Sequence, residues 1–239
     1  MNTALFGYGK MGKEIEKVLL ERGHTISHRI SSTDTLKTID FSNTDVIIEF
    51  SSPSSAKANI QFCIDNKLPI IIGTTGWYDD FEALSNRCKS NSSSMLYATN
   101  FSLGVNLFFK LNEQLAKLMN NHPSYTCSVT EIHHTEKLDA PSGTGITLAE
   151  GILKELDQKT QWENVCISDI SNENVLSLAS ERLPNVPGTH EIKYENEIDK
   201  IEISHTAHSR KGFALGSVIA AEWIIDKKGV FTMNDVLGL

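Results

Sequence analysis

Short apolar segments alternate with amphipathic segments through the first hundred residues, and this rhythm constrains the fold more than any other feature. Helices are expected after Gly12 and over residues 54–66 and 78–90. The apolar segments, expected to be strands, lie at residues 3–6, 25–30, 45–50, 69–72 and 95–98. Strands that alternate with helices at this spacing are typical of a doubly wound, Rossmann-like α/β fold with a parallel sheet.

A glycine-rich turn directly follows the first strand. It matches G-x-G-x-x-G and consists of Gly7, Tyr8, Gly9, Lys10, Met11 and Gly12. Glycines at these positions let the backbone approach a pyrophosphate, which then rests on the N-terminus of the next helix. The pattern alone also fits a plain glycine turn, but its place at the first strand–helix junction favours dinucleotide binding.

The turns after the later strands are further candidates for cofactor contact, since ligands of such sheets bind beyond the carboxyl ends of the strands. These candidates are Phe50, Ser51, Gly73, Thr74, Thr75, Ala98, Thr99, Asn100 and Phe101. An NAD enzyme would usually place an acid after the second strand, but no Asp or Glu lies between Arg22 and Thr33. Arg29 stands there instead, and it fits either the 2′-phosphate of NADP or an exposed, basic strand end.

The pattern changes after Asn106. A helix is expected over 105–119, and apolar and polar residues then alternate at 125–133, 175–182, 189–195 and 199–205. Such alternation indicates antiparallel strands with one covered face, here with a hairpin turn at Asn196-Glu197. We expect an α+β domain with an open mixed or antiparallel sheet, whose exposed face is a candidate oligomer interface. An apolar helix over 213–226 is expected to return and cover the parallel sheet.

Charge is distributed unevenly along the 239 residues, whose formal net charge is −8. Fifteen acidic and seven basic residues lie between positions 131 and 210, so this segment carries the whole excess. Nucleic-acid binding through a basic face is therefore not expected. The segment also holds five of the eight histidines, which together with Lys137 and Arg210 suggest a local cationic pocket: His133, His134, His190, His205 and His208.

The chain has the features of a soluble cytoplasmic protein. No apolar run approaches the roughly 20 residues of a membrane span, and the first residues lack the basic and apolar segments of a secretory signal. Cys63, Cys88, Cys127 and Cys166 are widely spaced, without a CxxC pair. This spacing favours thiols in a reducing compartment over a disulfide framework or a zinc site.

One short run, from Glu131 to Gly145, combines two kinds of chemistry. Adjacent His133 and His134 supply imidazoles, the side chains best suited to proton transfer near neutral pH. Lys137 precedes a Ser-Gly-Thr turn that is expected to open a helix. An ammonium and the free N–H groups of a helix start form a receptor for a carboxylate.

This run, E-x-H-H-x-x-K-x-D-A-P-S-G-T, resembles the signature of the dihydrodipicolinate reductase family, nicotinamide-dependent enzymes of diaminopimelate and lysine biosynthesis. The segments F-S-x-P, G-T-T-G and A-x-N-F-S-x-G-V-N resemble the cofactor loops of the same family. The resemblance covers nearly the whole chain. The chain departs from the family by a shorter segment between Ile30 and Asp45 and a glycine loop one residue shorter, both on the adenosine side of the cofactor.

The resemblance implies a role for each residue of the run. His133 would donate and accept the catalytic proton, and Lys137 would be the second proton donor. His134 would bind the substrate, a small dicarboxylate. Ser142, Gly143 and Thr144 would hold one of its carboxylates at the helix start.

The resemblance also implies how the chain is organised. Residues 1–104 and 211–239 would form the dinucleotide-binding domain, and residues 105–210 the substrate-binding and oligomerisation domain. Arg210, beside the second crossover, joins the residues expected to bind the cofactor. We expect NADPH as the cofactor, with NADH accepted, and a homo-oligomer, a tetramer by resemblance.

Other chemistries fit the sequence less well. Adjacent histidines in a strand point to opposite faces, and no helical H-x-x-x-H or H-E-x-x-H motif is present, so no metal is expected. Ser142 lies in P-S-G-T, which is not a nucleophile elbow. Two alternatives remain: another two-domain nicotinamide dehydrogenase acting on an amino-acid-like dicarboxylate, and a non-catalytic NADP-binding sensor.

Overall fold

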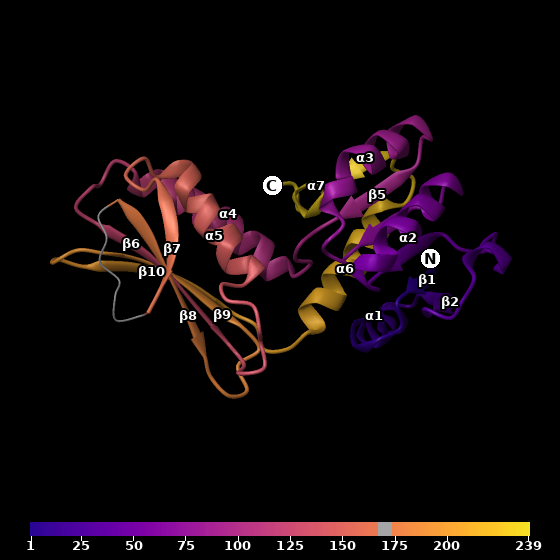
Figure 1. Ribbon diagram of the computed structural model, residues 1–239, viewed down its shortest axis with the longest axis horizontal. Helices are drawn as coiled ribbons and strands as arrows, with labels where there is room; N and C mark the ends of the chain where they lie inside the picture. Colours follow the sequence, from indigo (N-terminus) through magenta and orange to yellow (C-terminus); the bar gives the residue numbers. More distant parts are fainter. Residues whose placement is uncertain (167–173) are drawn as a thin grey trace. The chain divides into compact units, whose positions relative to one another are not determined.

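The computed structural model describes residues 1–166 and 174–239 and divides the chain into two compact units (Figure 1). The first unit contains Met1–Leu103 and Arg210–Leu239, and the second contains Gly104–Ser209. The chain therefore leaves the first unit after Leu103 and re-enters it at Arg210.

The first unit is built on a six-stranded sheet in which every pair of neighbouring strands is parallel. Its order is β11-β5-β4-β3-β1-β2, with β1 (Asn2–Phe6), β2 (Thr25–Ile30), β3 (Val46–Glu49), β4 (Ile70–Ile72), β5 (Ser94–Tyr97) and β11 (Gly229–Phe231). The doubly wound prediction is confirmed. The edge strand β11 was not predicted, because three residues are too few to show a period.

Helices cover both faces of this sheet, as Figure 1 shows. On one face lie α1 (Lys10–Glu21), α6 (Lys211–Ile224) and α7 (Met233–Leu237). On the other lie α2 (Pro53–Asp65) and α3 (Phe81–Ser90). Short 3₁₀ turns occupy Leu36–Thr38 and Tyr78–Asp80, so the helix expected from residue 78 begins as a 3₁₀ turn. With both faces covered, β3 and β4 are buried along their whole length, which explains their continuous apolar runs.

The second unit has a five-stranded mixed sheet and two helices. The helices are α4 (Leu103–Met119) and α5 (Gly143–Glu155). The sheet order is β10-β9-β6-β8-β7, with β6 (Thr126–His133), β7 (Gln161–Val165), β8 (Val175–Arg182), β9 (Thr189–Glu195) and β10 (Lys200–Thr206).

An open mixed or antiparallel sheet was predicted here, and the sheet is mixed: the pairs β6–β9 and β9–β10 are antiparallel. β8 runs parallel to both β6 and β7. After β6 the chain passes through α5 before it forms β7, and such a crossover returns the next strand in the same direction. β7 was not predicted, because the exposed edge strand Gln161–Val165 shows no clear apolar period.

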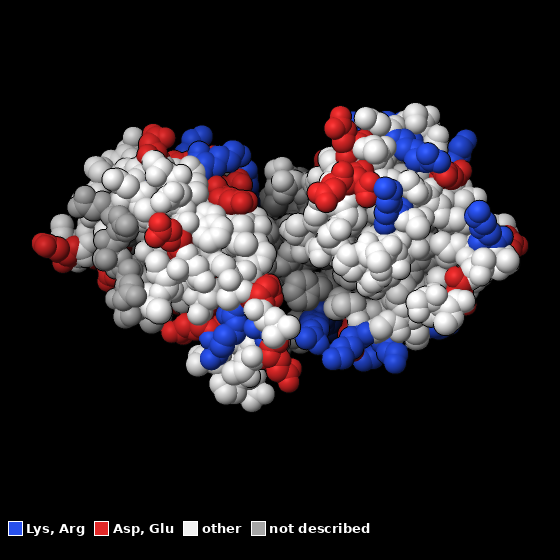
Figure 2. Space-filling view, in the orientation of Figure 1, with Lys and Arg blue, Asp and Glu red and all other residues white. Residues whose placement is uncertain are grey.

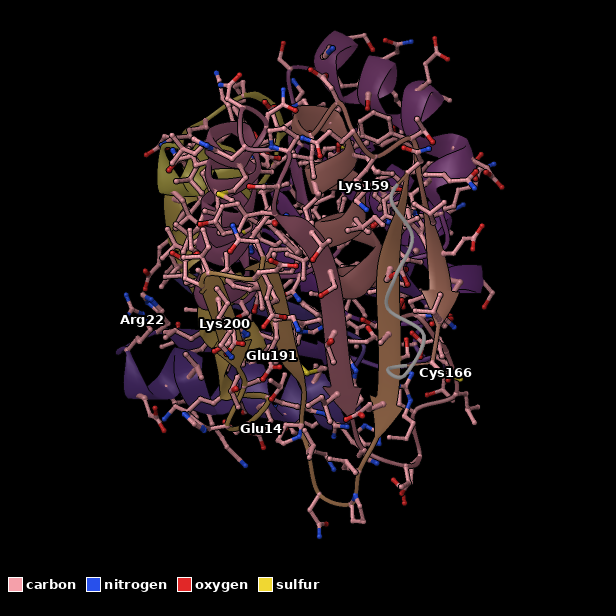
Figure 3. All side chains as sticks on the ribbon, turned by 90° about the vertical axis from the view of Figure 1, so that its left-hand side faces the viewer. Glu14, Arg22, Lys159, Cys166, Glu191 and Lys200 are labelled. Atoms are coloured by element: carbon pink, nitrogen blue, oxygen red, sulfur yellow. The ribbon has the colours of Figure 1, made fainter. Side chains whose placement is uncertain are left out.

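One face of this sheet is covered by α4 and α5, whose apolar side chains share a core with Val129, Leu178 and Ile192. The other face is polar. It is lined by Thr126, Ser128, Thr130, Glu191, Lys193, Glu195, Lys200 and Glu202. We refer to this polar face as the open face. Figure 3 shows two of its residues, Glu191 and Lys200, on the neighbouring strands β9 and β10.

Acidic and basic side chains are interspersed over the surface seen in Figure 2. Among the described residues, no helix combines the length and the apolar character needed to cross a bilayer.

Candidate active site

The glycine turn of the first unit is too tight for side chains at two positions. Gly7 has φ +94°, and a Cβ there would lie 2.1 Å from the carbonyl oxygen of Phe50. A Cβ on Gly12 would lie 2.3 Å from the carbonyl oxygen of Gly7. At Gly9, by contrast, no described atom lies within 4 Å of the Cβ position, and none of the described side chains caps the N-terminus of α1. The open N-terminus of α1 therefore fits a pyrophosphate.

The other predicted cofactor residues follow the carboxyl ends of β3, β4 and β5. The Phe50 ring packs against Gly73, where a Cβ would lie 2.1 Å from its Cζ, and its centroid is 5.7 Å from that of Phe101. The Ser51 amide donates to Oγ1 of Thr74 at 2.8 Å, so these two turns are joined.

The other residues predicted to bind the cofactor also lie in the first unit, and they differ in how exposed they are. Asn100 is buried and its Oδ1 accepts from the Ser102 amide at 2.9 Å. Ala98 is half-buried, whereas Lys10, Thr75, Thr99 and Arg210 are exposed, the last at the start of α6.

Arg29, near the end of β2, forms an ion pair with Glu16, which lies 13 residues earlier in the sequence. Its Nε donates to Oε1 of Glu16 on α1 at 3.1 Å, and its guanidinium lies 5.7 Å from the centroid of the Tyr8 ring. The Tyr8 hydroxyl also donates to Glu16. The hydrogen bond from Arg29 holds the pKa of Glu16 below its usual value. Sequence reasoning missed Glu16, since spacing along the chain gives no sign of this pairing.

In the second unit, the buried carboxylate of Glu131 joins β6 to the start of α5. The Ser142 amide lies 3.0 Å from each carboxylate oxygen of Glu131, and the Ser142 hydroxyl also donates to Glu131. Oγ of Ser142 accepts from the amide of Gly145 at 3.0 Å and so caps α5. A Cβ on Gly145 would lie 2.6 Å from Glu131, so glycine leaves room for the carboxylate.

Two imidazoles face the same carboxylate. Nδ1 of His133 lies 3.9 Å from Oε1 of Glu131, and Nε2 of His190 lies 3.8 Å from Oε2. The two rings meet edge to face with centroids 5.1 Å apart. Burial lowers the pKa of His190 to about 4, and burial, partly offset by Glu131, lowers the pKa of His133. Burial alone would raise the pKa of Glu131, but hydrogen bonds from Ser142 bring it below its usual value.

The loop after β6 carries the predicted lysine. Nζ of Lys137 donates to both carboxylate oxygens of Asp139 at 2.8 Å, which holds the pKa of Asp139 below its usual value. Arg182 at the end of β8 fastens the loop, since its Nη2 donates to the carbonyl oxygen of Asp139 at 2.6 Å. Half-buried His134 accepts at its carbonyl oxygen from the Lys137 amide at 3.1 Å.

The first unit thus offers a nucleotide cradle, and the second offers imidazoles, an ammonium and a helix start. Family models agree with this division. "Dihydrodipicolinate reductase, N-terminus" matches residues 1–101, and "Dihydrodipicolinate reductase, C-terminus" matches residues 104–237. The chain belongs to the dihydrodipicolinate reductase family.

Known proteins similar to this reductase support the assignment. A 4-hydroxy-tetrahydrodipicolinate reductase of Christiangramia forsetii is 46% identical over 237 residues, which cover 99% of this chain and 98% of that protein. Dipicolinate-bound dihydrodipicolinate reductase from Paenisporosarcina sp. TG-14 has a similar fold, with TM-score 0.77, 20% identity and 97% coverage of both chains. An amine dehydrogenase from Mycobacterium smegmatis is also similar in fold, with TM-score 0.60, 10% identity and 96% and 94% coverage. The family resemblance noted in the sequence is confirmed.

One group in the reductase resembles a metal site. Potential ligand atoms of Glu131, His133 and His190 lie within 4.8 Å of one another. The carboxylate is already used, however, because Ser142 donates to both oxygens and Nη2 of Arg182 lies 3.4 Å from Oε1. A guanidinium this close would repel a divalent cation, so we assign no metal ligands here.

The sequence alone pointed to His133 and Ser142 but not to the residues that connect them. Arg182 was not singled out, and His190 was counted among the clustered histidines without a role. Glu131 opened the quoted run but received no function. The available signal was its spacing: residues two apart in a strand share a face, so Glu131 and His133 both point toward α5.

Proposed function

We propose that this reductase acts on the cyclic dicarboxylate 4-hydroxy-tetrahydrodipicolinate, whose 4-hydroxyl leaves as water while the ring accepts hydride from NAD(P)H to give tetrahydrodipicolinate. This is a step of diaminopimelate and lysine biosynthesis. The proposal rests chiefly on the position of Glu131 between His133 and the capped start of α5. Its Oε1 lies 3.9 Å from Nδ1 of His133 and accepts from the Ser142 amide at 3.0 Å. The name of the curated relative and the dipicolinate bound to the structural neighbour support a dicarboxylate substrate.

His133 and Lys137 supply protons in this proposal. Bound NAD(P)H supplies the hydride, and a ring that accepts hydride gains electron density that must be protonated. His133 donates that proton from the end of β6, with Lys137 as the second donor. His134 contacts the substrate from the adjacent position.

The start of α5 binds one carboxylate of the substrate. Gly143 and Thr144 are the first two residues of the helix, and Ser142 caps it without blocking them, since no described atom lies within 4 Å of a Cβ placed on Gly143. Helix amides and the positive end of the helix dipole favour a carboxylate there.

Replacing Thr144 by valine tests this carboxylate site. The variant keeps the branched shape and removes the hydroxyl donor, so we expect a pyridine-2,6-dicarboxylate inhibitor to bind about 1–3 kcal/mol more weakly. The inhibition constant measures the effect, and Thr160→Val, an exposed position beyond the C-terminal end of α5, is the control. An unchanged inhibition constant in Thr144→Val would place the carboxylate elsewhere.

The first unit holds the cofactor through the glycine turn and the loops after β3, β4 and β5. We propose NADPH as the preferred cofactor and NADH as a tolerated one. Glu16 engages Nε and one terminal nitrogen of Arg29, so the pair orients the guanidinium and leaves further donors for a 2′-phosphate. A charge-assisted contact of this kind is worth about 1.5–3 kcal/mol.

Replacing Arg29 by glutamate tests the cofactor preference. We expect the Michaelis constant for NADPH to rise far more than that for NADH, because the new carboxylate repels only the 2′-phosphate. Arg87→Glu makes the same charge change on α3, where Arg87 pairs with Asp65, and serves as the control. Equal effects of Arg29→Glu on the two cofactors would show that Arg29 does not contact the 2′ position.

We also propose a cytoplasmic homotetramer, in which the open face of the second unit forms an interface between subunits. Mixed charges on this face, such as Glu191 and Lys193 on β9, suit pairing with a second copy of the same surface. Sedimentation equilibrium would measure the assembly.

An assay of NADPH consumption with freshly made product of the preceding synthase tests the proposed function. We expect NADPH to be oxidised only when this substrate is present. Oxidation of an amino acid by NADP would indicate another dehydrogenase. Tight cofactor binding without turnover would indicate a sensor.

A further inference from the structure

We propose that Glu131 is a positioning residue: one buried carboxylate orients the catalytic imidazole of His133 and the carboxylate-binding start of α5 together. The inference rests on the proposed function and assigns a role within the same site. Glu131 would thereby keep His133, the proton donor, in a fixed position relative to the start of α5, which binds the substrate.

The burial of Glu131 requires an explanation, because an ionised carboxylate without water is strongly unfavourable unless donors surround it. Glu131 is fully buried, and its donors include the amide and hydroxyl of Ser142 and Nη2 of Arg182. Two of these donors belong to the residue that caps α5. The position of the α5 start is therefore set by this carboxylate.

His133 is oriented toward the same group. Glu131 and His133 are two residues apart on β6 and share its covered face. Nδ1 of His133 is buried, has no hydrogen-bond partner among the described residues, and lies 3.9 Å from Oε1 of Glu131. A hydrogen on Nδ1 is favoured next to a carboxylate, so Nε2 is the nitrogen left to exchange a proton with substrate.

The charged groups around His133 show why this carboxylate matters for proton donation. Glu131 on β6 and Asp139 in the loop favour the imidazolium, whereas Lys137 in the same loop and Arg182 on β8 oppose it. His190 on β9 faces the ring edge to face. Burial already lowers the pKa of His133, and Glu131 is the largest influence that raises it. Loss of the Glu131 charge would therefore lower this pKa further.

The tautomer of His133 in the wild-type enzyme is the first test. Nitrogen-15 NMR of the histidine side chains should show neutral His133 with its hydrogen on Nδ1. Neutral His133 with its hydrogen on Nε2 would overturn the proposal. This measurement requires no variant and no substrate, so its failure is distinct from a failure of the reductase assay.

The second test is Glu131→Gln, which keeps the size of the side chain and an oxygen that can accept from the Ser142 amide. We expect the pKa of His133 in NMR titration to fall by about one unit or more. The decline of kcat that occurs as pH rises through the pKa of His133 should therefore begin at lower pH. The Michaelis constant for NADPH should stay within about twofold of wild type, because the cofactor binds the other unit.

Glu181→Gln is the matched control, since Glu181 precedes Arg182 on β8 and pairs in register with Ile132, whose side chain points away from the face of Glu131. It makes the same charge change and should leave the pKa of His133 unaltered.

If Glu131→Gln does not fold, Glu131→Asp keeps the charge on a shorter side chain and should leave the Nδ1 hydrogen in place. An unaltered His133 pKa in folded Glu131→Gln, or a lost Nδ1 hydrogen in Glu131→Asp, would refute the proposal.

Discussion

Replacement of His133 by glutamine is expected to lower kcat by about a hundredfold or more. The amide fills the space of the imidazole at the end of β6 but does not release a proton near neutral pH. Cofactor affinity should change little, because the candidate cofactor residues lie in the first unit. Steady-state kinetics and NADPH titration measure the two effects. His122→Gln, an exposed position in the same unit, is the control.

Lys137→Ala should produce a loss of the same order, since it removes the second proton donor. Its ammonium is held by Asp139, whose own carbonyl is fastened by Arg182, so the loop should keep its place without the lysine side chain. Lys154→Ala, an exposed position on α5, controls for the loss of a charge. Wild-type turnover in either His133→Gln or Lys137→Ala would remove that residue from the mechanism.

Gly7→Ala is expected to lower the free energy of unfolding by about 2–4 kcal/mol. Two costs add: φ +94° is unfavourable for alanine, and the new methyl would lie 2.1 Å from the carbonyl oxygen of Phe50. The displaced turn should also weaken NADPH binding. Urea unfolding followed by tryptophan fluorescence measures stability, and fluorescence titration measures cofactor affinity.

Gly9→Ala is the matched control for Gly7→Ala. It adds the same methyl in the same turn, but no described atom lies within 4 Å of that position. We expect a stability loss below about 1 kcal/mol, from the poorer helix cap alone. Equal losses in the two variants would mean that the contact between Gly7 and Phe50 does not limit the turn.

The parallel sheet could be predicted because its physical cause is local. Strands such as β3 are buried on both faces, so their sequences are continuously apolar, and a glycine turn marks the first helix. The strand β7 could not be predicted, since an exposed edge strand carries no apolar period. The parallel pairing of β6 with β8 depends on a crossover through α5, which no local pattern encodes.

The candidate site divides in the same way. His133, Lys137 and Ser142 lie within ten residues of one another in a recognisable run, so the sequence brings them together. Glu131 pairs with Arg182 and His190 only through the register of three strands. Long-range pairs of this kind, like Arg29 with Glu16, require the fold, because spacing along the chain does not indicate which side chains meet.

Hydride transfer from NADPH to the cyclic dicarboxylate can be followed by isotope transfer. NADPH deuterated on the transferable face of its nicotinamide ring is mixed with the enzyme and freshly made product of the preceding synthase. Mass spectrometry then identifies the product. We expect tetrahydrodipicolinate that carries one deuterium for each NADPH oxidised. Unlabelled tetrahydrodipicolinate, or no oxidation of NADPH with this substrate, would contradict this expectation.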